Sequence, residues 1–408
     1  MDIHQVNIES IVKQVLSQIQ KEEQGSQPQK QPVGSSFSES IPTKAKAGVL
    51  TALNKIEVKE FPIPEIGPDD MLIRIEGCGV CGTDVHEYKN DPFGLIPVVL
   101  GHEGTGVIVK MGENIKRDSA GKVVKVGDHI VTSVIPCGEC PICKKDPGKN
   151  NLCDDVQVYG LLPDDEYHLN GWFGEYIVLR KGSSFFQVNN MSLKLRLLIE
   201  PAAVVVHAVE RAKTTGLLTF NTQALVQGCG PIGLLLIAVL RTMGIENIIG
   251  VDGDEKRLAM AKRLGATQTI NFKNYKDNDK VAARVKELTG GLGADFAFQC
   301  TGVPQAASNI WKFVRRGGGL CEVGFFVDNG HSSINPHFDI CNKEITVVGS
   351  WVYTVQDYPI TFDFLRRAKA IGLPIEELVT HEFGLEELNE AMAVNMKQEG
   401  IKIAYVNR

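Results

Sequence analysis

Two side chains that bind transition metals stand in short glycine-rich runs in the first half of the chain. Cys81 lies in the run CGTDVH, and His102 lies in the run GHEGTG. A thiolate and an imidazole are ligands that Zn²⁺ accepts in a tetrahedral site, which in an enzyme keeps one position open. Either residue alone is most often an ordinary buried side chain. The pair together predicts a catalytic zinc.

Four further cysteines predict a second metal site. The spacing C-x2-C-x2-C-x9-C, on a loop rich in glycine, proline and lysine, is formed by Cys137, Cys140, Cys143 and Cys153. Four thiolates at such spacing wrap one tetrahedral ion, and a closed site of this kind contributes folding free energy rather than catalysis. An exposed cluster of free thiols would instead be an oxidation liability. We therefore expect two zinc ions per subunit.

A glycine fingerprint follows the apolar run ALVQ and precedes the helical run LLLIAVLRTMG. Its residues are Gly228, Cys229, Gly230, Pro231, Ile232 and Gly233. Glycines at this spacing allow a tight turn, close approach of a pyrophosphate and close helix packing, with the helix N-terminus supplying positive partial charge. The next apolar run ends in Asp252, whose carboxylate favours the ribose of NAD over the 2′-phosphate of NADP. Arg257 nearby is a cofactor candidate that would also tolerate a phosphate.

These motifs, in this order, resemble the zinc-containing medium-chain dehydrogenases, and the resemblance covers residues 47–408. It implies that Cys81, His102 and an acidic residue hold the catalytic zinc. The phrase LIEPA resembles the polyol and threonine dehydrogenase branches, which makes Glu200 the expected third ligand, with Glu103 as the alternative. Glu200 also suits the N-terminus of a helix, where an acid is favourable with the helix dipole.

The resemblance further implies an activity: a small alcohol or polyol is interconverted with its aldehyde or ketone, with NAD(H) as the hydride carrier. Zinc would act as a Lewis acid on the substrate oxygen. Thr83 would take the proton and pass it through the cofactor ribose to His86, while Asp84 orients the imidazole of His102. A surface role for His86, and a catalytically inactive scaffold protein with this fold, are the alternatives.

The segments that must position these residues differ in pattern. Residues 47–199 carry short alternating apolar runs broken by proline and glycine, as antiparallel strands do, and form the expected GroES-like catalytic domain. Residues 200–350 alternate helix and strand, with strands expected at 224–227, 247–252, 294–300, 319–326 and 345–351. This alternation predicts a doubly wound parallel sheet, the Rossmann domain that binds NAD. Residues 351–408 are expected to return to the catalytic domain. The fold class is therefore α/β.

An N-terminal appendage precedes the enzyme. Residues 1–20 have the apolar spacing of a short amphipathic helix, and residues 21–46, rich in Gln, Ser and Pro, have the composition of a disordered linker. The segment IESIVKQVLSQI resembles the encapsulation peptides of bacterial microcompartments. This resemblance implies docking to a microcompartment shell or core protein, and packing of the helix on its own subunit is the alternative.

Composition limits the other partners. A net charge of -6 gives no electrostatic reason to bind nucleic acid, and no apolar stretch has the length of a membrane span. We expect a cytoplasmic enzyme, inside a microcompartment if the appendage docks. It is expected to act on a small alcohol or aldehyde and to assemble as a homodimer or homotetramer.

Overall fold

A computed structural model describes residues 40–408. The predicted helix in residues 1–20 and most of the predicted linker fall on residues 1–39 and lie outside this description. Strand β1 begins at Lys44, inside the predicted linker, because Lys44 to Lys46 pair with Pro62 to Glu60 of β2. The prediction that the linker reaches Lys46 is therefore wrong.

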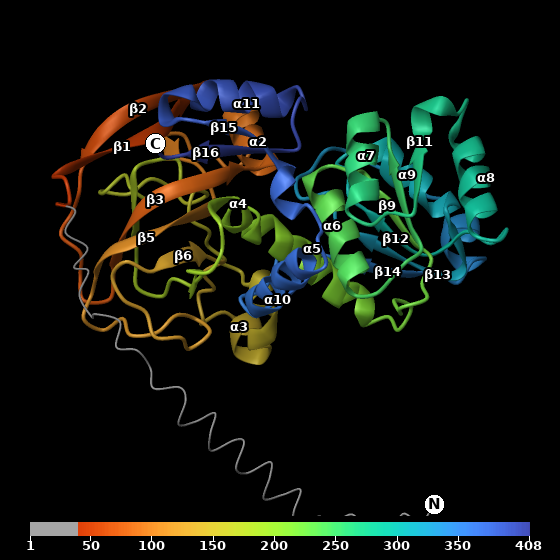
Figure 1. The fold of residues 1–408 in the computed structure, drawn as a ribbon, viewed down its shortest axis with the longest axis horizontal. Helices are drawn as coiled ribbons and strands as arrows, with labels where there is room; N and C mark the ends of the chain where they lie inside the picture. The colour runs from red at the N-terminus through yellow and green to blue at the C-terminus, as the bar shows by residue number, and fades with distance from the viewer. Residues whose placement is uncertain (1–39) are drawn as a thin grey trace, which may run out of the picture. The chain divides into compact units, whose positions relative to one another are not determined.

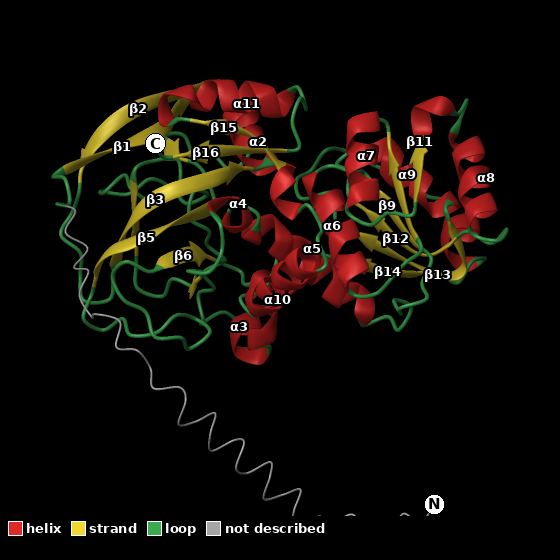
Figure 2. Ribbon diagram, viewed as in Figure 1, coloured by secondary structure: helices red, strands yellow, loops and turns green. Residues whose placement is uncertain are grey.

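The first lobe is built of strands that pair antiparallel, except for the parallel pair β15 Val379–Phe383 and β16 Lys402–Val406 (Figures 1 and 2). A sheet of order β15-β16-β3-β5-β6-β8, with β7 paired to β3, packs with a small sheet of order β2-β1-β4. Two of its strands, β15 and β16, come from the end of the chain. The strands from the N-terminal half are β1 Lys44–Ala52, β2 Lys55–Pro62, β3 Met71–Val80, β4 Val98–Val99, β5 Glu103–Met111, β6 His129–Thr132, β7 Tyr176–Leu179 and β8 Phe185–Gln187. Their helices are α2 Gly82–Asn90, α3 Pro141–Lys145, the short η1 Pro147–Leu152 and α4 Leu193–Arg196. The inward-facing side chains of these strands form one apolar core.

The second lobe is a six-stranded parallel sheet of order β11-β10-β9-β12-β13-β14, with helices on both of its faces (Figure 2). Its strands are β9 Ala224–Gln227, β10 Ile248–Asp252, β11 Gln268–Asn271, β12 Ala294–Gln299, β13 Val314–Glu322 and β14 Thr346–Gly349. Its longer helices are α5 Ile199–Lys213, α6 Pro231–Thr242, α7 Glu255–Arg263, α8 Asn278–Leu288 and α9 Pro304–Asn309. Such a sheet with helices on both sides is the doubly wound arrangement, so the predicted fold class is confirmed.

Sequence reasoning missed one strand and misjudged the start of another. β11 is an edge strand with a polar, half-exposed pattern, which carries no apolar run to recognise. β13 begins at Val314 rather than at residue 319, because its first residues include two arginines and three glycines that do not read as a buried strand.

The last two strands of the chain lie in the first sheet. Helix α10 Asp357–Ala370 packs against α5 and α6, and after it come β15 Val379–Phe383, α11 Leu388–Met396 and β16 Lys402–Val406. β16 pairs antiparallel with β3, so its residues reach the strand that ends next to Cys81. The described residues include no helix with the length and apolarity that a membrane crossing requires.

Candidate active site and metal centres

Cys81 and His102 meet because of the register between two strands. β3 and β5 are antiparallel, with Gly79 opposite Glu103. The residue that follows β3, Cys81, therefore lies next to the residue that precedes β5, His102. Cys81 is the N-cap of α2, and His102 immediately precedes β5. A local strand pairing therefore brings the two halves of the sequence motif together.

Glu103 completes a group of three possible metal ligands. The ligand atoms of Cys81, His102 and Glu103 all lie within 4.8 Å of one another. A Cβ atom at Gly79 would collide with the Glu103 carboxylate, so glycine at this position leaves the space that the carboxylate occupies. His102 and Glu103 are 6% and 2% exposed, which makes this a buried, polar cluster that needs partners.

Asp84 orients this group from the first turn of α2. Its Oδ2 accepts a hydrogen bond from the Cys81 backbone N–H at 2.8 Å, and its Oδ1 accepts one from the Gly101 N–H at 3.1 Å. The same Oδ1 lies 3.3 Å from Nδ1 of His102. With Nδ1 turned toward Asp84, Nε2 of the imidazole is available as a ligand atom, which matches the arrangement expected of a carboxylate behind a metal-binding histidine.

Glu200 lies beside the three-residue group but is not part of it. It stands in the first turn of α5, close enough for its charge to interact with Glu103 and His102, and it hydrogen-bonds the Tyr353 side chain. Burial raises the pKa of Glu200 to about 7, and the neighbouring Glu103 raises it as well. The sequence favoured Glu200 over Glu103 as third ligand, whereas the geometry groups Glu103 with Cys81 and His102.

Lys402 is a buried cation at this site that sequence reasoning did not select. Its ammonium group forms an ion pair with the Glu103 carboxylate and donates to the Val80 carbonyl at 3.2 Å. Lys402 is 3% exposed, and it begins the otherwise apolar strand KIAYV. A charged residue at an inward-facing position of an otherwise apolar strand was the signal that could have identified it.

The electrostatics of the cluster suit a bound cation. Burial alone lowers the pKa of His102, but the charges of Asp84 and Cys81 outweigh it and raise that pKa well above its usual value. Burial likewise lowers the pKa of Lys402, and Glu103 and Cys81 raise it above its usual value. The raised pKa values of these two bases indicate that negative charge exceeds positive charge in their surroundings. A sulfur, a nitrogen and an oxygen donor in that field are a ligand set that Zn²⁺ accepts.

Thr83 and His86 follow on α2. The Thr83 hydroxyl lies 3.7 Å from Sγ of Cys81. His86 packs edge-on against Phe326, with ring centroids 5.6 Å apart, and lines a cavity of about 450 Å³ together with Phe93 and Trp351. Burial lowers the pKa of His86, and the charge of Lys89 lowers it further, so the imidazole is neutral and able to accept a proton at neutral pH.

The glycine fingerprint has the geometry that a dinucleotide requires. Gly228 takes φ +92°, and Gly230 is the N-cap of α6. A Cβ at Gly230 would meet nothing within 4 Å, which leaves open space in front of the helix N-terminus, whereas a Cβ at Gly233 would collide with the Gly228 carbonyl. Pro231 and Ile232 form the first turn of α6. The residues therefore fit a pyrophosphate at this turn.

Asp252 ends β10 next to this turn. Its Oδ2 accepts from the Cys229 N–H at 2.7 Å, and its Oδ1 accepts from the Gly253 and Asp254 N–H groups at 2.7 and 2.9 Å. These bonds hold a carboxylate at the end of the strand that neighbours the fingerprint. Arg257 lies in the first turn of α7, and its backbone N–H donates to the Asp254 carboxylate.

The four cysteines of the predicted structural site converge around α3 and η1. The ligand atoms of Cys137, Cys140, Cys143 and Cys153 all lie within 4.8 Å of one another. Backbone N–H groups point at the sulfurs, for example from Cys137 to Sγ of Cys153 at 3.2 Å. Hydrogen bonds from backbone N–H groups lower the pKa of Cys140 to about 6, which favours its thiolate. Four converging sulfurs with such donors fit one tetrahedral zinc.

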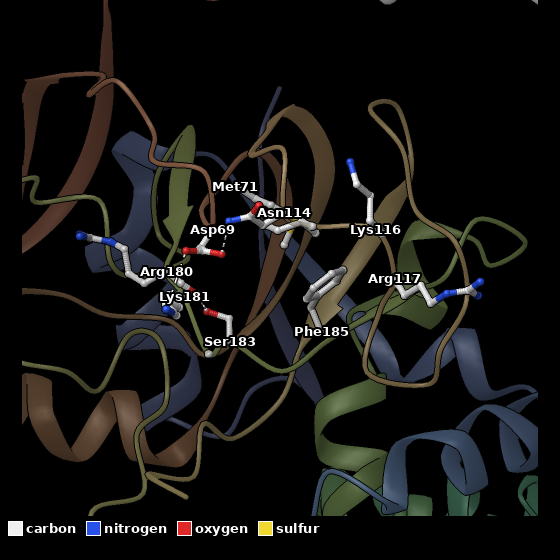
Figure 3. Close-up of a pocket in the computed structure, with 11 residues that line it drawn as sticks. Asp69, Met71, Asn114, Lys116, Arg117, Arg180, Lys181, Ser183 and Phe185 are labelled. Atoms are coloured by element: carbon white, nitrogen blue, oxygen red, sulfur yellow. Dashed lines mark hydrogen bonds and ion pairs between the residues drawn. The ribbon is translucent and has the colours of Figure 1, made fainter.

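A separate cavity of about 390 Å³ opens on the first lobe (Figure 3). It is lined by Met71, the first residue of β3, whereas Cys81 follows the last residue of that strand. At about 3.3 Å per residue, Met71 and Cys81 are roughly 30 Å apart. Its Arg180 is paired with Asp165, and its Arg117 donates to the Gly121 carbonyl. We assign this cavity no role in the site.

Both lobes match known protein families. Residues 67–189 match the family described as alcohol dehydrogenase GroES-like domain, and residues 231–367 match the family described as zinc-binding dehydrogenase. The chain is 33% identical to a sorbitol dehydrogenase of Bacillus subtilis, over 91% of this chain and all of that protein. It is 30% identical to an L-idonate 5-dehydrogenase of Vitis vinifera, over 87% of this chain and 92% of that protein. Among solved structures, an alcohol dehydrogenase of Thermotoga maritima aligns with a TM-score of 0.83 at 30% identity, over 90% of this chain and all of that one.

Proposed function

Because the chain belongs to the zinc-containing medium-chain alcohol dehydrogenases, we propose that it oxidises a small polyol or secondary alcohol, or reduces the matching carbonyl compound, beside Cys81, His102 and Glu103. It is an oxidoreductase acting on CH–OH groups, and its cofactors are zinc and NAD(H). The observation that carries the substrate proposal is the likeness to the sorbitol and L-idonate dehydrogenases, together with a buried site of one thiol, one imidazole and one carboxyl.

In this proposal Cys81, His102 and Glu103 hold the catalytic zinc. Zinc supplies Lewis acidity toward the substrate oxygen when it is bound. Asp84 fixes the imidazole of His102, and Lys402 holds the Glu103 carboxylate by its ion pair. Glu200 faces the same space from α5 and is proposed to lie beside the substrate rather than on the metal.

Thr83 and His86 are proposed to move the substrate proton. Thr83 lies next to the thiol of Cys81, and His86 stands one helical turn further along α2, at the solvent-connected cavity. Thr83 accepts the proton from the substrate oxygen, and the neutral imidazole of His86 takes it on toward solvent. Phe93, Phe326 and Trp351 line the same cavity.

The cofactor is proposed to bind with its pyrophosphate on Gly228, Gly230 and Gly233 and its adenosine ribose on Asp252. The open space at Gly230 and the carboxylate at the end of β10 support this assignment. Four cysteines, Cys137, Cys140, Cys143 and Cys153, are proposed to hold the second, structural zinc.

A panel of polyols, short primary and secondary alcohols and their carbonyl products, followed by NADH absorbance, tests the activity. Turnover that depends on NAD(H) and is lost with a chelator is expected for polyols or secondary alcohols. Metal analysis of Glu103→Gln and Glu200→Gln then separates the two carboxylates: Glu103→Gln should lose the catalytic zinc, and Glu200→Gln should keep it. Loss of zinc from Glu200→Gln alone contradicts the assignment, and full turnover in the chelated enzyme contradicts the activity.

We also propose that the enzyme is a homodimer or homotetramer. β14 has one neighbour, β13, among the described strands, and its Val347 is 45% exposed. An exposed apolar edge strand is suited to pairing with the same strand of a second copy. Light scattering of Val347→Lys should show a smaller species than the unchanged protein, and an unchanged mass would reject this interface.

Residues 1–20 are proposed to dock the enzyme to a bacterial microcompartment shell or core protein. The support is the sequence IESIVKQVLSQI and its resemblance to encapsulation peptides. Inside a compartment the enzyme would reduce an aldehyde and regenerate NAD. Deletion of residues 1–20 should leave turnover unchanged and disperse the protein in cells, whereas unchanged localisation would remove this proposal.

A further inference from the structure

The segment from Trp351 to Asp357 contacts the candidate active site. It joins β14 to α10. Trp351 lines the cavity that also contains His86, and Tyr353, which is 1% exposed, hydrogen-bonds Glu200. This short segment therefore contacts the site at two places, at its mouth and beside the proposed substrate position.

The backbone of this segment is strained between those two contacts. Val352 has φ +52°, in the left-handed region that a β-branched residue rarely adopts. Such a conformation costs free energy and persists only where the surrounding structure holds it. The residues on either side of Val352 must therefore be held by partners outside the segment.

Those partners come from the four-cysteine loop. Asn151, which stands two residues before Cys153 and is 4% exposed, donates from Nδ2 to the Trp351 carbonyl at 2.7 Å. Its neighbour Asn150 accepts from the Val355 N–H at 3.1 Å and donates to the Gln356 side chain at 2.8 Å. The two asparagines thus hold the segment on both sides of Val352 and Tyr353.

Helix α5 fixes the same segment from the other side. His207 follows Glu200 by seven residues, two helical turns later, and so lies on the same face of α5. Nδ1 of His207 lies 2.9 Å from Asp357, whose carboxylate accepts from the Thr354 N–H and hydroxyl, both at 2.7 Å. The other ring nitrogen of His207 lies 3.4 Å from Asn151 Nδ2.

We propose that the four-cysteine loop is a positioning element of the candidate active site: Asn150 and Asn151 hold the Trp351–Asp357 segment so that Tyr353 stays against Glu200. Cys143 and Cys153 flank the two asparagines in the sequence, so closure of the sulfur cluster fixes where the asparagines stand. The four-thiolate site then affects substrate binding as well as folding. The substrate part of this inference rests on the proposed function.

Fluorescence quenching tests the clamp without turnover. The chain has three tryptophans, of which Trp172 and Trp311 are 0% and 9% exposed and Trp351 is 48% exposed, so acrylamide quenching reports mainly on Trp351. Asn151→Ala removes the hydrogen-bond donor to the Trp351 carbonyl. It should increase the quenching constant about twofold, because the Trp351 indole would change from half exposed to fully exposed. Cys140→Ser, which opens the sulfur cluster, should give the same change.

Kinetics then separate positioning from general stability. Asn151→Ala should raise the KM for the alcohol about fivefold, the factor expected for one lost hydrogen bond, and leave the KM for NAD unchanged. The matched control is Asn389→Ala, because Asn389 makes three hydrogen bonds to Ile56 and Tyr88, away from this segment. Lys149→Ala, an exposed change in the same loop, should behave as the unchanged enzyme.

Two outcomes would overturn the inference. One is a lower melting temperature in Asn151→Ala and Cys140→Ser with Trp351 quenching unchanged. The other is an equal rise in alcohol KM in Asn389→Ala, which would mean that any loss of stability has this effect. If no alcohol is turned over by the unchanged enzyme, the proposed activity fails while the quenching experiment still decides whether the loop holds the segment.

Discussion

Replacement of Lys402 by methionine should strongly destabilise the first lobe. Lys402 and Glu103 form an ion pair in which both side chains are almost fully buried, at 4% and 1% exposure. Methionine keeps the length of the side chain and its apolar contacts, but leaves the Glu103 carboxylate buried without its cation. Breaking one side of such a pair costs about 3–5 kcal/mol. We expect a loss of this size in the free energy of unfolding of the zinc-free protein.

A double-mutant cycle checks the cause. In Glu103→Gln the carboxylate is already gone, so the further change Lys402→Met should cost about 3 kcal/mol less than it does alone. Chemical unfolding followed by far-UV circular dichroism gives the four free energies. The stabilising effect of added Zn²⁺ should be larger in Lys402→Met than in the unchanged protein, because the metal replaces the lost positive charge. Additivity within about 0.5 kcal/mol would refute the reasoning, since it would mean that the two charges do not interact.

Three further predictions concern the cofactor, the stability profile and the second metal. Asp252→Ser should raise the KM for NAD about tenfold to a hundredfold, because charge-assisted hydrogen bonds to the ribose are lost. In steady-state assays the ratio of the kcat/KM for NAD to that for NADP should fall. If this ratio is unchanged, Asp252 does not have the proposed role. Burial and the neighbouring Asp91 raise the pKa of Glu87 to about 7, so the folded protein favours the protonated carboxyl. The stabilisation from this protonated form is fully present below pH 4.5, the pKa of an ordinary Glu, and is lost as the pH rises through 7. Glu87→Gln stays neutral, and its melting temperature relative to the unchanged protein should rise between pH 5 and 8; a pH-independent difference would count against the buried carboxyl. Cys140→Ser should reduce the zinc content from two ions to one per chain and lower the melting temperature, and retention of both ions would show that the sulfur cluster is not the second site.

The sequence was informative wherever the chemistry is local. The turn at Gly228 to Gly233 and the cysteines from Cys137 to Cys153 are each contained in a short run, and the spacing within a run limits the geometry that it can adopt. The alternation of apolar strands and helices likewise predicts a doubly wound sheet, because a parallel strand buried on both faces needs an apolar run. The polar edge strand β11 lacks that run and was missed for this reason.

The grouping of residues at the candidate metal site depends on contacts between distant segments. Motif order alone left Glu103 and Glu200 as competing ligands, and it did not identify Lys402 or Tyr353. Strand pairing places Glu103 beside Cys81 and brings Lys402 from the other end of the chain to the same carboxylate, while α5 holds Glu200 just outside the group. Ligand selection depends on differences of an ångström or two, and such differences arise only when whole elements pack against one another.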